Sequence, residues 1–434
     1  MRLSRNPITE VKAMYQPNLI FTKDTNLTYL RKLELVFSCL DIPDKNYCTG
    51  RPPYPVPAMV NALVFKNLRG LLNLADLTRE LSCYPALTQA CGFRSFPSKE
   101  RFSHFLKYTP NELFRHIKEG LVKELLRLGE IKAEYLSTDS CPVKSPVKEN
   151  NLKTNVRDRF DKNKIPRTDK DARLGVYVVY PSNKKVQFFW GYRNHIVNDA
   201  VSELPLAEIT KPANVHEATL LIPQLEYLKK AFKISPRAII ADSAFDSCAI
   251  IEHIVKKLKA KPVIAKNPRG GGNPDIKLSS KGAPICQAGF EMLSCGKFYD
   301  KEQNRVRHKF ACPIKMSKKF ARKTGWFCPW NHPKFFSNRY GCTTNLRIDV
   351  DTSIRQNIDY GSQAFKKLYN LRTSSERIFS RLLMFSMQRC SVKGLNTTTN
   401  LCSLAHISVL AVALAAVKSG EKHKLRFIKS FFAI

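Results

Sequence analysis

The sequence predicts an α/β protein with a helical N-terminal domain and an insertion inside its α/β core. Three observations support this prediction. Apolar residues recur at a helical period up to about residue 118, and short β-type runs alternate with helices from about residue 131. Between about residues 266 and 350 that alternation stops. At 434 residues, 43% of them hydrophobic, the chain is long enough for two or three structural units.

The N-terminal part is predicted to consist of helices separated by turns. Residues 58–74 carry apolar side chains at a period close to 3.6, namely Val60, Leu63, Val64, Leu68, Leu71 and Leu72. The stretch GRPPYPVP at residues 50–57 precedes this helix, and its prolines exclude helix there.

The core is predicted to begin with a strand at residues 134–138 that ends at Asp139. A hairpin of strands 173–180 and 185–192 follows, joined by the turn PSNK. The later elements are a helix within 215–232 after Pro223, a buried strand at 238–241 ending at Asp242, an amphipathic helix marked by Ala249, Ile250, Ile254, Val255 and Leu258, and a short strand at 262–265. This order of elements is the one expected of a ribonuclease-H-like α/β core.

The region after this core is predicted to be an inserted, β-rich subdomain. It contains Gly270 to Gly272, five cysteines and frequent aromatic residues. The predicted domains are therefore a helical domain at residues 1–118, the first part of the α/β core at 119–265, the inserted subdomain at 266–350 and the C-terminal helices of the core at 351–434.

The charge of the chain indicates a polyanionic partner. Lys and Arg number 72 against 36 Asp and Glu, which gives a formal net charge of +36 and a pI near 9.8. Nucleic acid is the first candidate, because phosphate neutralisation rewards many dispersed cations. A protein of the membrane surface would gather its charge on an amphipathic helix or beside a span, whereas here the charge is spread over the whole chain.

The remaining compositional features favour a cytoplasmic protein with reduced thiols. The cysteines number thirteen, an odd count, and the first residues lack the apolar core of a signal peptide. The longest apolar run, residues 401–417, is short for a membrane span and contains Ser403, His406 and Ser408. We expect a buried C-terminal helix there.

Two aspartates at predicted strand ends are candidates for metal binding. Asp139 lies in the polar exit STDS of the first strand, where a turn or cap role is the alternative. Asp242 ends the strand in AIIADSAFDS and competes with Asp246. Because Asp246 lies just before a helix, we expect it to cap that helix and expect Asp242 to bind metal.

The third candidate carboxylate is Glu376. Tyr369, Arg372 and Glu376 stand at i, i+3 and i+7, and at about 100° per residue a single helix would present them within roughly 60° of one another. An aromatic ring, a guanidinium and a carboxylate on one face suit a site that holds both a metal and a DNA backbone. The alternative is a solvated stripe with an Arg372–Glu376 ion pair.

Three weaker signals remain open. The cysteines Cys286, Cys295, Cys312, Cys328 and Cys342, with His332, could bind zinc, although no C-x2-C pair is present and free thiols are the alternative. Residues 144–173 are dense in charge and are predicted to form a mobile loop that is solvated when free. His195 in GYRNH is expected to be structural, and neither it nor Glu217 enters the predicted catalytic set.

Several blocks of the chain resemble the insertion-sequence transposases of the DDE type. The spacing Tyr-x2-Arg-x3-Glu after two strand-end aspartates resembles the signature of that family, whose core is ribonuclease-H-like. The segments GRPPYPVPAMVNALVFKNLRGLLNLADLTREL and GFRSFPSKERFSHFL look like its N-terminal helical domain. KPANVHEATLLIPQL, WGYRNH and ADSAFDS are similar to its blocks around the second aspartate. The resemblance is collinear from about Gly50 to Val417.

The resemblance implies an activity and a set of partners. Asp139, Asp242 and Glu376 would be catalytic residues that bind metal, with Mg²⁺ as the ion and Mn²⁺ as its substitute, and Tyr369 and Arg372 would contact DNA. The substrate would be double-stranded DNA with terminal inverted repeats, bound by a homodimer on paired ends. The protein would excise and transfer an insertion sequence in the bacterial cytoplasm, in association with the nucleoid.

One position departs from the family signature. A Lys usually follows the Glu by seven residues, but position 383 is Leu383, and Arg381 lies about 140° from Glu376 around a helix. This departure leaves two alternatives open: a catalytically decayed or domesticated DNA-binding protein, or a nuclease on the same core.

Overall fold

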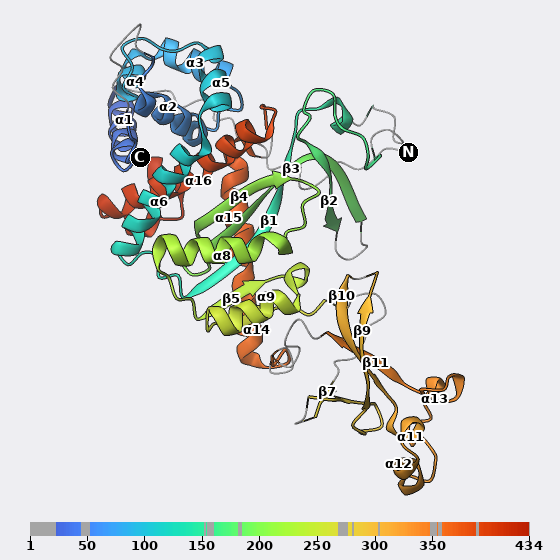
Figure 1. Ribbon diagram of the computed structural model, residues 1–434. Coiled ribbons are helices and arrows are strands. Elements are labelled where there is room, and N and C mark those ends of the chain that lie inside the picture. Colours follow the sequence, from blue (N-terminus) through green and yellow to red (C-terminus); the bar gives the residue numbers. More distant parts are fainter. Residues whose placement is uncertain are drawn as a thin grey trace. The chain divides into compact units, whose positions relative to one another are not determined.

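The computed structural model describes residues 23–44, 53–151, 153, 160–180, 185–267, 277–279, 282–302, 304–347, 354, 358–387 and 390–433. The chain divides into two compact units. Unit 1 comprises residues 1–236 and 371–434, and unit 2 comprises residues 237–370. The chain is therefore a mixed α/β protein in which unit 2 is inserted into unit 1 (Figure 1).

The N-terminal part of unit 1 is helical, as predicted. Its helices are α1 (Lys23–Ser38), α2 (Val56–Arg69), α3 (Leu74–Cys83), α4 (Pro85–Ala90), α5 (Lys99–Tyr108) and α6 (Asn111–Arg127). The helix predicted at residues 58–74 ends earlier, because Gly70 adopts a left-handed φ of 73° and Asn73 then caps α3. It also begins earlier, since Pro57 fits its first turn, where no backbone N–H is needed. Residues 50–52 and the turn PSNK lie outside the described residues.

Four antiparallel strands form the sheet of unit 1: β1 (Tyr135–Lys144), β2 (Arg173–Tyr180), β3 (Lys185–Asp199) and β4 (Leu204–Pro212). The long strand β3 pairs with the other three. The predicted first strand does not end at Asp139, because Asp139 pairs with Ile196 and the pairing continues to Lys144. Strand β4 was not predicted.

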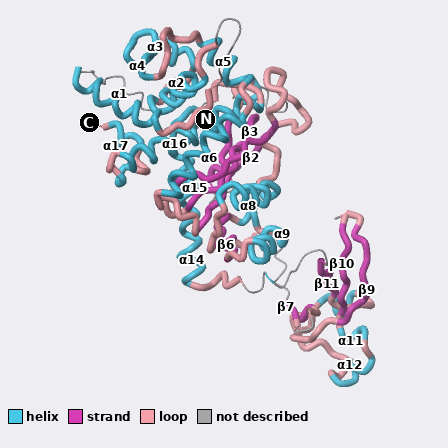
Figure 2. The backbone as a smooth tube through the Cα atoms, turned by 60° about the vertical axis from the view of Figure 1, so that its left-hand side comes forward, coloured by secondary structure: helices cyan, strands magenta, loops and turns pink. Residues whose placement is uncertain are grey.

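Helices pack around this sheet. They are α8 (Ala218–Phe232), α15 (Thr373–Leu382), α16 (Leu395–Lys418) and α17 (Ile428–Phe432), with a π turn at Leu383–Met387 and 3-10 turns at Lys148–Asn150 and Lys422–Lys424. Helix α8 begins at Ala218 and contains Pro223, so the prediction of helix only after Pro223 was wrong. Helix α16 contacts α1, α2, α5, α6 and β4, and both ribbon views show it beside α6 (Figure 2).

Helix α16 is the apolar run predicted to be a buried helix. It begins at Leu395, after Gly394, rather than at residue 401. It is the one described helix that is long and apolar enough to cross a membrane, and 94% of its most apolar window is buried inside the protein. The prediction of a buried helix is confirmed.

A buried polar network links α16 to the sheet and to α6. The Lys118 ammonium lies 3.2 Å from a carboxylate oxygen of Glu208, and Ser403 of α16 donates a hydrogen bond of 2.6 Å to the same oxygen. His406 lies 2.9 Å from the amide oxygen of Asn194. Burial is the strongest single influence and raises the pKa of Glu208, but the charges of Lys118 and His406 and the hydrogen bonds from Ser403 and Asn194 together outweigh it, and the pKa falls to about 2. The charged pair therefore anchors α6, β4 and α16 to one another.

The loop predicted to be solvated at residues 144–173 is partly buried. Asp169 is 3% exposed and accepts hydrogen bonds of 2.5 Å from Ser145 and 2.6 Å from Tyr192. The amide of Asn150 donates to the carbonyl oxygen of Trp190 over 2.7 Å. These described parts of the loop are thus fixed to the sheet, because their polar groups find partners on β3.

Unit 2 begins with two parallel strands, β5 (Ala238–Ala241) and β6 (Lys261–Ile264). They are connected by a 3-10 turn at Ser243–Phe245, α9 (Cys248–Glu252) and a π turn at His253–Lys257. Both strands and the intervening helical segment were predicted. Helix α14 (Gln363–Tyr369) contacts β5 and β6 and is followed by a 3-10 turn at Asn370–Arg372.

The inserted subdomain lies between β6 and α14. Its strands are β7 (Lys277–Leu278), β8 (Pro284–Ile285), β9 (Leu293–Asp300), β10 (Arg305–Ala311) and β11 (Thr343–Arg347). The last three form a sheet in the order β11-β10-β9. Three short helices, α11 (Pro313–Met316), α12 (Lys318–Lys323) and α13 (Pro333–Ser337), lie between β10 and β11 in the chain (Figure 1). Residues 270–272 lie outside the described residues.

Candidate active site

Asp139 lies in the middle of β1 and not at a strand end. Its side chain is 20% exposed, and its Oδ1 accepts a hydrogen bond of 2.7 Å from the backbone N–H of Ser140. The guanidinium of Arg372 lies 3.7 Å from its other oxygen. The carboxylate therefore keeps some access to solvent, through which a metal ion can reach it.

A buried hydrogen-bond network fixes α15 on β1 and β3. The hydroxyls of Ser137 and Ser375 lie 2.8 Å apart, and Ser375 donates to Asn198 over 2.8 Å. The amide of Asn198 in turn donates to Ser374 over 3.0 Å. All four residues are fully buried. Because small hydroxyl side chains allow close approach, this network sets the position of the next residue on the helix, Glu376.

Arg372 joins two of the predicted catalytic carboxylates. It donates a hydrogen bond of 2.7 Å to Glu376 and forms the 3.7 Å ion pair with Asp139. The Glu376 side chain is 55% exposed, so it retains access to solvent. The Arg372–Glu376 pair expected from the i, i+4 spacing is present, and the structure adds Asp139 to it. One cation thus offsets two neighbouring negative charges.

Asp242 belongs to unit 2, where it directly follows the buried strand β5. Its Oδ1 accepts a hydrogen bond of 2.9 Å from the backbone N–H of Ala244. Asp242 therefore also caps a 3-10 turn, whereas the sequence had pointed to Asp246 for a capping role.

The prediction that Asp246 caps the following helix was wrong. Ser247 caps α9 by accepting a hydrogen bond from Ile250. Asp246 is instead fully buried and accepts a hydrogen bond of 2.8 Å from the backbone N–H of Asn267. A serine directly after an aspartate competes for the cap, and the long-range contact to residue 267 has no signal in the local sequence.

The single helix predicted to carry Tyr369, Arg372 and Glu376 is interrupted. Tyr369 ends α14 in unit 2, and its ring stacks on Phe365 with 6.0 Å between centroids. Arg372 ends the 3-10 turn, and Glu376 lies in the first turn of α15 in unit 1. The prediction that one helix face presents all three side chains therefore holds for Arg372 and Glu376 but not for Tyr369.

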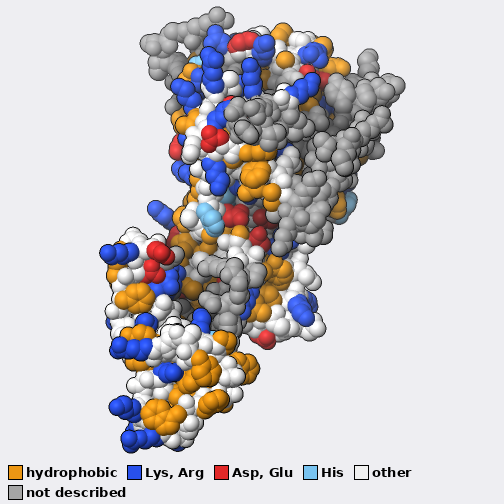
Figure 3. Space-filling model, turned by 90° about the vertical axis from the view of Figure 1, so that its right-hand side faces the viewer, with side chains coloured by type: hydrophobic (Ala, Val, Ile, Leu, Met, Phe, Trp, Pro, Cys, Tyr) orange, Lys and Arg blue, Asp and Glu red, His pale blue; other side chains and the backbone are white. Residues whose placement is uncertain are grey.

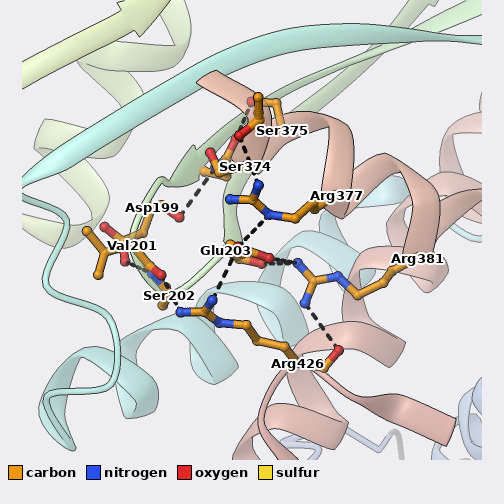
Figure 4. Close-up of polar contacts among 11 residues, drawn as sticks. Asp199, Val201, Ser202, Glu203, Ser374, Ser375, Arg377, Arg381 and Arg426 are labelled. Carbon is orange, nitrogen blue, oxygen red and sulfur yellow. Dashed lines mark hydrogen bonds and ion pairs between the residues drawn. The ribbon is translucent and has the colours of Figure 1, made fainter. Parts of the chain in front are cut away.

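Arg381 has a structural role. It donates to the carbonyl oxygen of Glu203 over 2.6 Å, and its guanidinium lies 3.4 Å from the Glu203 carboxylate (Figure 4). Arg377 and Arg426 bind the same carboxylate over 2.6 and 3.2 Å. Three arginines thus converge on the Glu203 carboxylate at the β3–β4 turn. Arg381 would have to give up its bonds to Glu203 to take the place of the missing lysine at position 383.

Sequence reasoning missed a second polar group on β1. Ser140 donates a hydrogen bond of 2.5 Å to Glu217 and accepts one of 2.9 Å from Arg193. These residues adjoin a cavity of about 410 Å³ that is also lined by the basic side chains Lys162, Arg173 and His216. Arg193 and Glu217 lie in WGYRNH and KPANVHEATLL, so the two family-like blocks did carry the signal.

His195 lies on β3 and is buried. It is 2% exposed, and its carbonyl oxygen accepts a hydrogen bond of 3.1 Å from Gln224. Burial, followed by the charge of Arg193, lowers its pKa to about 4, so the ring is neutral near pH 7.

The donor atoms around Arg372 are those that hard divalent cations prefer. Asp139 and Glu376 offer carboxylate oxygens, which suit Mg²⁺ or Mn²⁺ better than softer ions. Within the described residues, no three His, Cys, Asp or Glu side chains are gathered into a ready metal site. Unit 1 thus brings two carboxylates to one arginine side chain.

Comparisons with known proteins agree with these features. The transposase DDE domain family matches residues 162–410, which is more than half of the chain and includes Asp242 and Glu376 but not Asp139. A second transposase domain matches residues 23–108, which cover α1 to α5. No curated protein sequence matches the chain.

One similar solved structure is the cryo-EM structure of a piggyBac transposase synaptic complex with hairpin DNA. The two chains are 14% identical, and the match covers 93% of this chain and 79% of that one with a TM-score of 0.38, too distant a likeness to support an argument. The two family matches follow one another in the order that the sequence blocks predicted. The chain belongs to the DDE transposases of insertion sequences and is a DNA transposase.

Proposed function

We propose that this transposase cuts and rejoins DNA with two divalent metal ions held by Asp139, Asp242 and Glu376. The observation that carries the proposal is the shared contact of Asp139 and Glu376 with Arg372, because it brings together two carboxylates that are 237 positions apart in the chain. Asp242 is included because it follows a buried strand and lies in the family-like block ADSAFDS. The ions are proposed to be Mg²⁺, with Mn²⁺ as a substitute.

The residues of the site would share the work of binding and positioning. Bound metal would activate the attacking oxygen and stabilise charge at phosphorus. Asp139 and Glu376 would hold the ions, while the buried serines keep α15 in place. Arg372 would exchange its carboxylate partners for a DNA phosphate, because a guanidinium binds both groups with the same geometry. Tyr369 would contact DNA near the transposon end.

The wider arrangement is proposed to be that of a ribonuclease-H-like core acting on DNA with terminal inverted repeats. Support comes from the antiparallel strands that carry Asp139, the parallel pair that precedes Asp242 and the charge of +36. A homodimer would hold paired ends, and the protein would act in the bacterial cytoplasm in association with the nucleoid. The four domains predicted from the sequence remain our proposal for its organisation.

The end of the inserted subdomain is a proposed DNA contact. Four aromatic side chains are 55–61% exposed there: Trp326, Phe327, Trp330 and Phe336. Lys318, Lys319, Arg322 and Lys323 lie on the neighbouring helix α12. Figure 3 shows exposed hydrophobic side chains among Lys and Arg at its lower end. Cations for phosphates and rings for unpaired bases are the two components of a surface that binds single-stranded DNA.

The carboxylate assignment is tested by Asp139→Asn, Asp242→Asn and Glu376→Gln. Each change removes charge while preserving size, so folding and DNA binding should survive. Donor-strand cleavage with Mg²⁺ or Mn²⁺ should fall by more than the roughly 10–100-fold that substitutions outside the ligand shell cost. The 3′-end transfer to a target should fall with it.

Glu252→Gln is the matched control, because Glu252 forms a surface pair of 2.9 Å with Lys256 in the same unit as Asp242. Asp246→Asn does not serve, since Asp246 is buried and bonded to Asn267. Wild-type cleavage by all three carboxylate variants would reject the metal site. If the unsubstituted chain binds DNA but does not cleave it, the result would favour a decayed DNA-binding protein. If the unsubstituted chain cleaves DNA but transfers no strand, the result would favour a nuclease.

A further inference from the structure

Three cysteines from separate segments lie in or against the core of the inserted subdomain, and a fourth is tied to a residue that packs on it. Cys312 and Cys328 are 3% and 5% exposed and belong to a small buried cluster that also contains Ile314, Ala321 and Phe335. Cys342 and Phe290 pack against this cluster. Cys286 is tied to Phe290, because its backbone N–H donates a hydrogen bond of 2.9 Å to the Phe290 carbonyl oxygen.

Backbone contacts bring the segments around Cys312 and Cys342 together. The N–H of Cys312 donates a hydrogen bond of 3.2 Å to the carbonyl oxygen of Tyr340. Gly341 lies so close that a Cβ there would be 2.9 Å from the Cys312 Cβ and 3.6 Å from its sulfur. Gly341 also has a φ of +64°. Both this backbone conformation and the lack of space for a Cβ favour glycine at this position. The chain thus passes directly over Cys312 just before it reaches Cys342.

Two of the four cysteines begin tight turns. The carbonyl oxygen of Cys286 accepts a hydrogen bond of 2.9 Å from Gly289, and that of Cys328 accepts one of 2.9 Å from Asn331. Both turns end in a left-handed residue, with φ of 79° at Gly289 and 48° at Asn331. Such turns fix the backbone at each cysteine locally, without a large apolar core to hold it.

The buried cluster gathers the thiols: Cys312 and Cys328 belong to it, Cys342 packs against it, and Cys286 is tied to it through Phe290. Thiolates gathered in one cluster would repel one another unless a cation lay among them. All four are free thiols rather than disulfides.

We propose that Cys286, Cys312, Cys328 and Cys342 bind one structural Zn²⁺ ion. Four thiolates are the ligands that structural zinc sites use, at Zn–S distances of about 2.3 Å. The subdomain needs such a staple, because its buried cluster is small and small cores rarely hold a fold alone. Within the described residues no three Cys, His, Asp or Glu side chains are already grouped to hold a metal ion, so binding requires the four cysteine side chains to turn toward a common centre.

The surroundings suit the charge of such a site. Zn²⁺ with four thiolates carries a net charge of −2. Lys315 follows Cys312 by three residues, and its Cγ would lie only 3.1 Å from a Cβ at position 341. Its ammonium stands 4.5 Å from the centre of the Phe335 ring. A cation therefore lies at the edge of the cluster, while the apolar side chains exclude water from the sulfurs.

The test measures zinc in the purified full-length chain by elemental mass spectrometry, together with the absorption spectrum after Co²⁺ replacement. Wild type should contain about one zinc ion per chain, and Co²⁺ should give the spectrum of tetrahedral thiolate coordination. Cys312→Ser and Cys342→Ser should lose the metal. Cys295→Ser is the matched control, because Cys295 lies on β9 of the same subdomain and outside the cluster.

Misfolding of the serine variants is separated from loss of a ligand by Cys328→His, which keeps a zinc ligand and should retain the ion. Zinc content should be unchanged in Asp139→Asn and Glu376→Gln, so the fate of the catalytic proposal does not affect this one. Wild-type protein that is reduced but binds neither Zn²⁺ nor Co²⁺ would overturn the proposal. So would zinc that persists in both serine variants, or thiol counting that finds the four cysteines in disulfides.

Discussion

At the residue scale, small buried polar side chains position one of the candidate carboxylates, Glu376. Ser137, Asn198, Ser374 and Ser375 are fully buried and bond to one another. They hold α15 against β1 and β3, and Glu376 follows directly. Removing one hydroxyl leaves its neighbours without a partner in a buried place, which costs about 1–3 kcal/mol.

We predict that Ser375→Ala lowers both stability and cleavage. The thermal midpoint should fall, and cleavage should require more Mg²⁺, because Glu376 is no longer held beside Asp139. Ser380→Ala on the exposed side of the same helix is the control and should leave both unchanged. If Ser375→Ala loses stability but keeps the wild-type Mg²⁺ dependence, the network is structural and does not position the site.

At the element scale, the helix that was predicted to run through the whole signature is three elements. Helix α14, the 3-10 turn and α15 succeed one another, and a π turn at Leu383–Met387 follows. Leu383 begins that π turn and is half-buried, whereas its neighbour Leu382 is fully buried. The position at which the family has a lysine therefore keeps some access to solvent.

We predict that Leu383→Lys folds normally and binds transposon-end DNA at least as tightly as wild type. A lysine can keep its ammonium in solvent at a half-buried site, and it adds a phosphate contact. A thermal melt and a DNA-binding titration measure the two effects. Leu382→Lys is the control that should unfold the protein, since it buries an unpaired charge. Melting of Leu383→Lys like Leu382→Lys would contradict the prediction.

At the scale of the whole molecule, unit 1 is organised around polar groups that α16 buries. His406 on α16 is fully buried, and burial lowers its pKa to about 4, as it does for His195. Both rings bind protons more weakly in the folded protein than in the unfolded chain, where the pKa is about 6.5. Glu208 keeps its charge down to a pH of about 2, so the Lys118–Glu208 pair stays intact in the window where the histidines titrate.

We predict that unit 1 loses stability as the pH falls from about 6.5 to 4. In that window the unfolded chain binds more protons than the folded protein. The free energy of unfolding therefore falls by up to about 1.4 kcal/mol per pH unit for each histidine as the pH is lowered. The urea midpoint would be followed by the fluorescence of Trp190, which is fully buried, in a Trp326→Phe, Trp330→Phe background. His406→Gln should flatten the slope, and a slope unchanged by this substitution would exclude His406 as its source.

Local sequence determined the elements whose signal lies within a few residues. The N-terminal helices, the hairpin of β2 and β3, the short buried strands β5 and β6 and the burial of α16 were all predictable from apolar period and length. The collinear family blocks likewise determined that the chain is a DDE transposase. Motifs and their order along the chain can be recognised without knowing which residues are in contact.

Tertiary contacts decided what the local pattern could not. The register of β1 on β3 carried the strand past Asp139, and the contact with Asn267 buried Asp246 while Ser247 took its cap. Glu203 drew Arg381 away from the site, and Arg372 joined Asp139 to Glu376. Cys312, Cys328 and Cys342 came into one buried cluster without any paired motif, because their segments come from distant parts of the subdomain. Each outcome depends on a contact with a residue far away in the chain. Such a contact contributes to the free energy of folding, but the local sequence pattern does not reveal it.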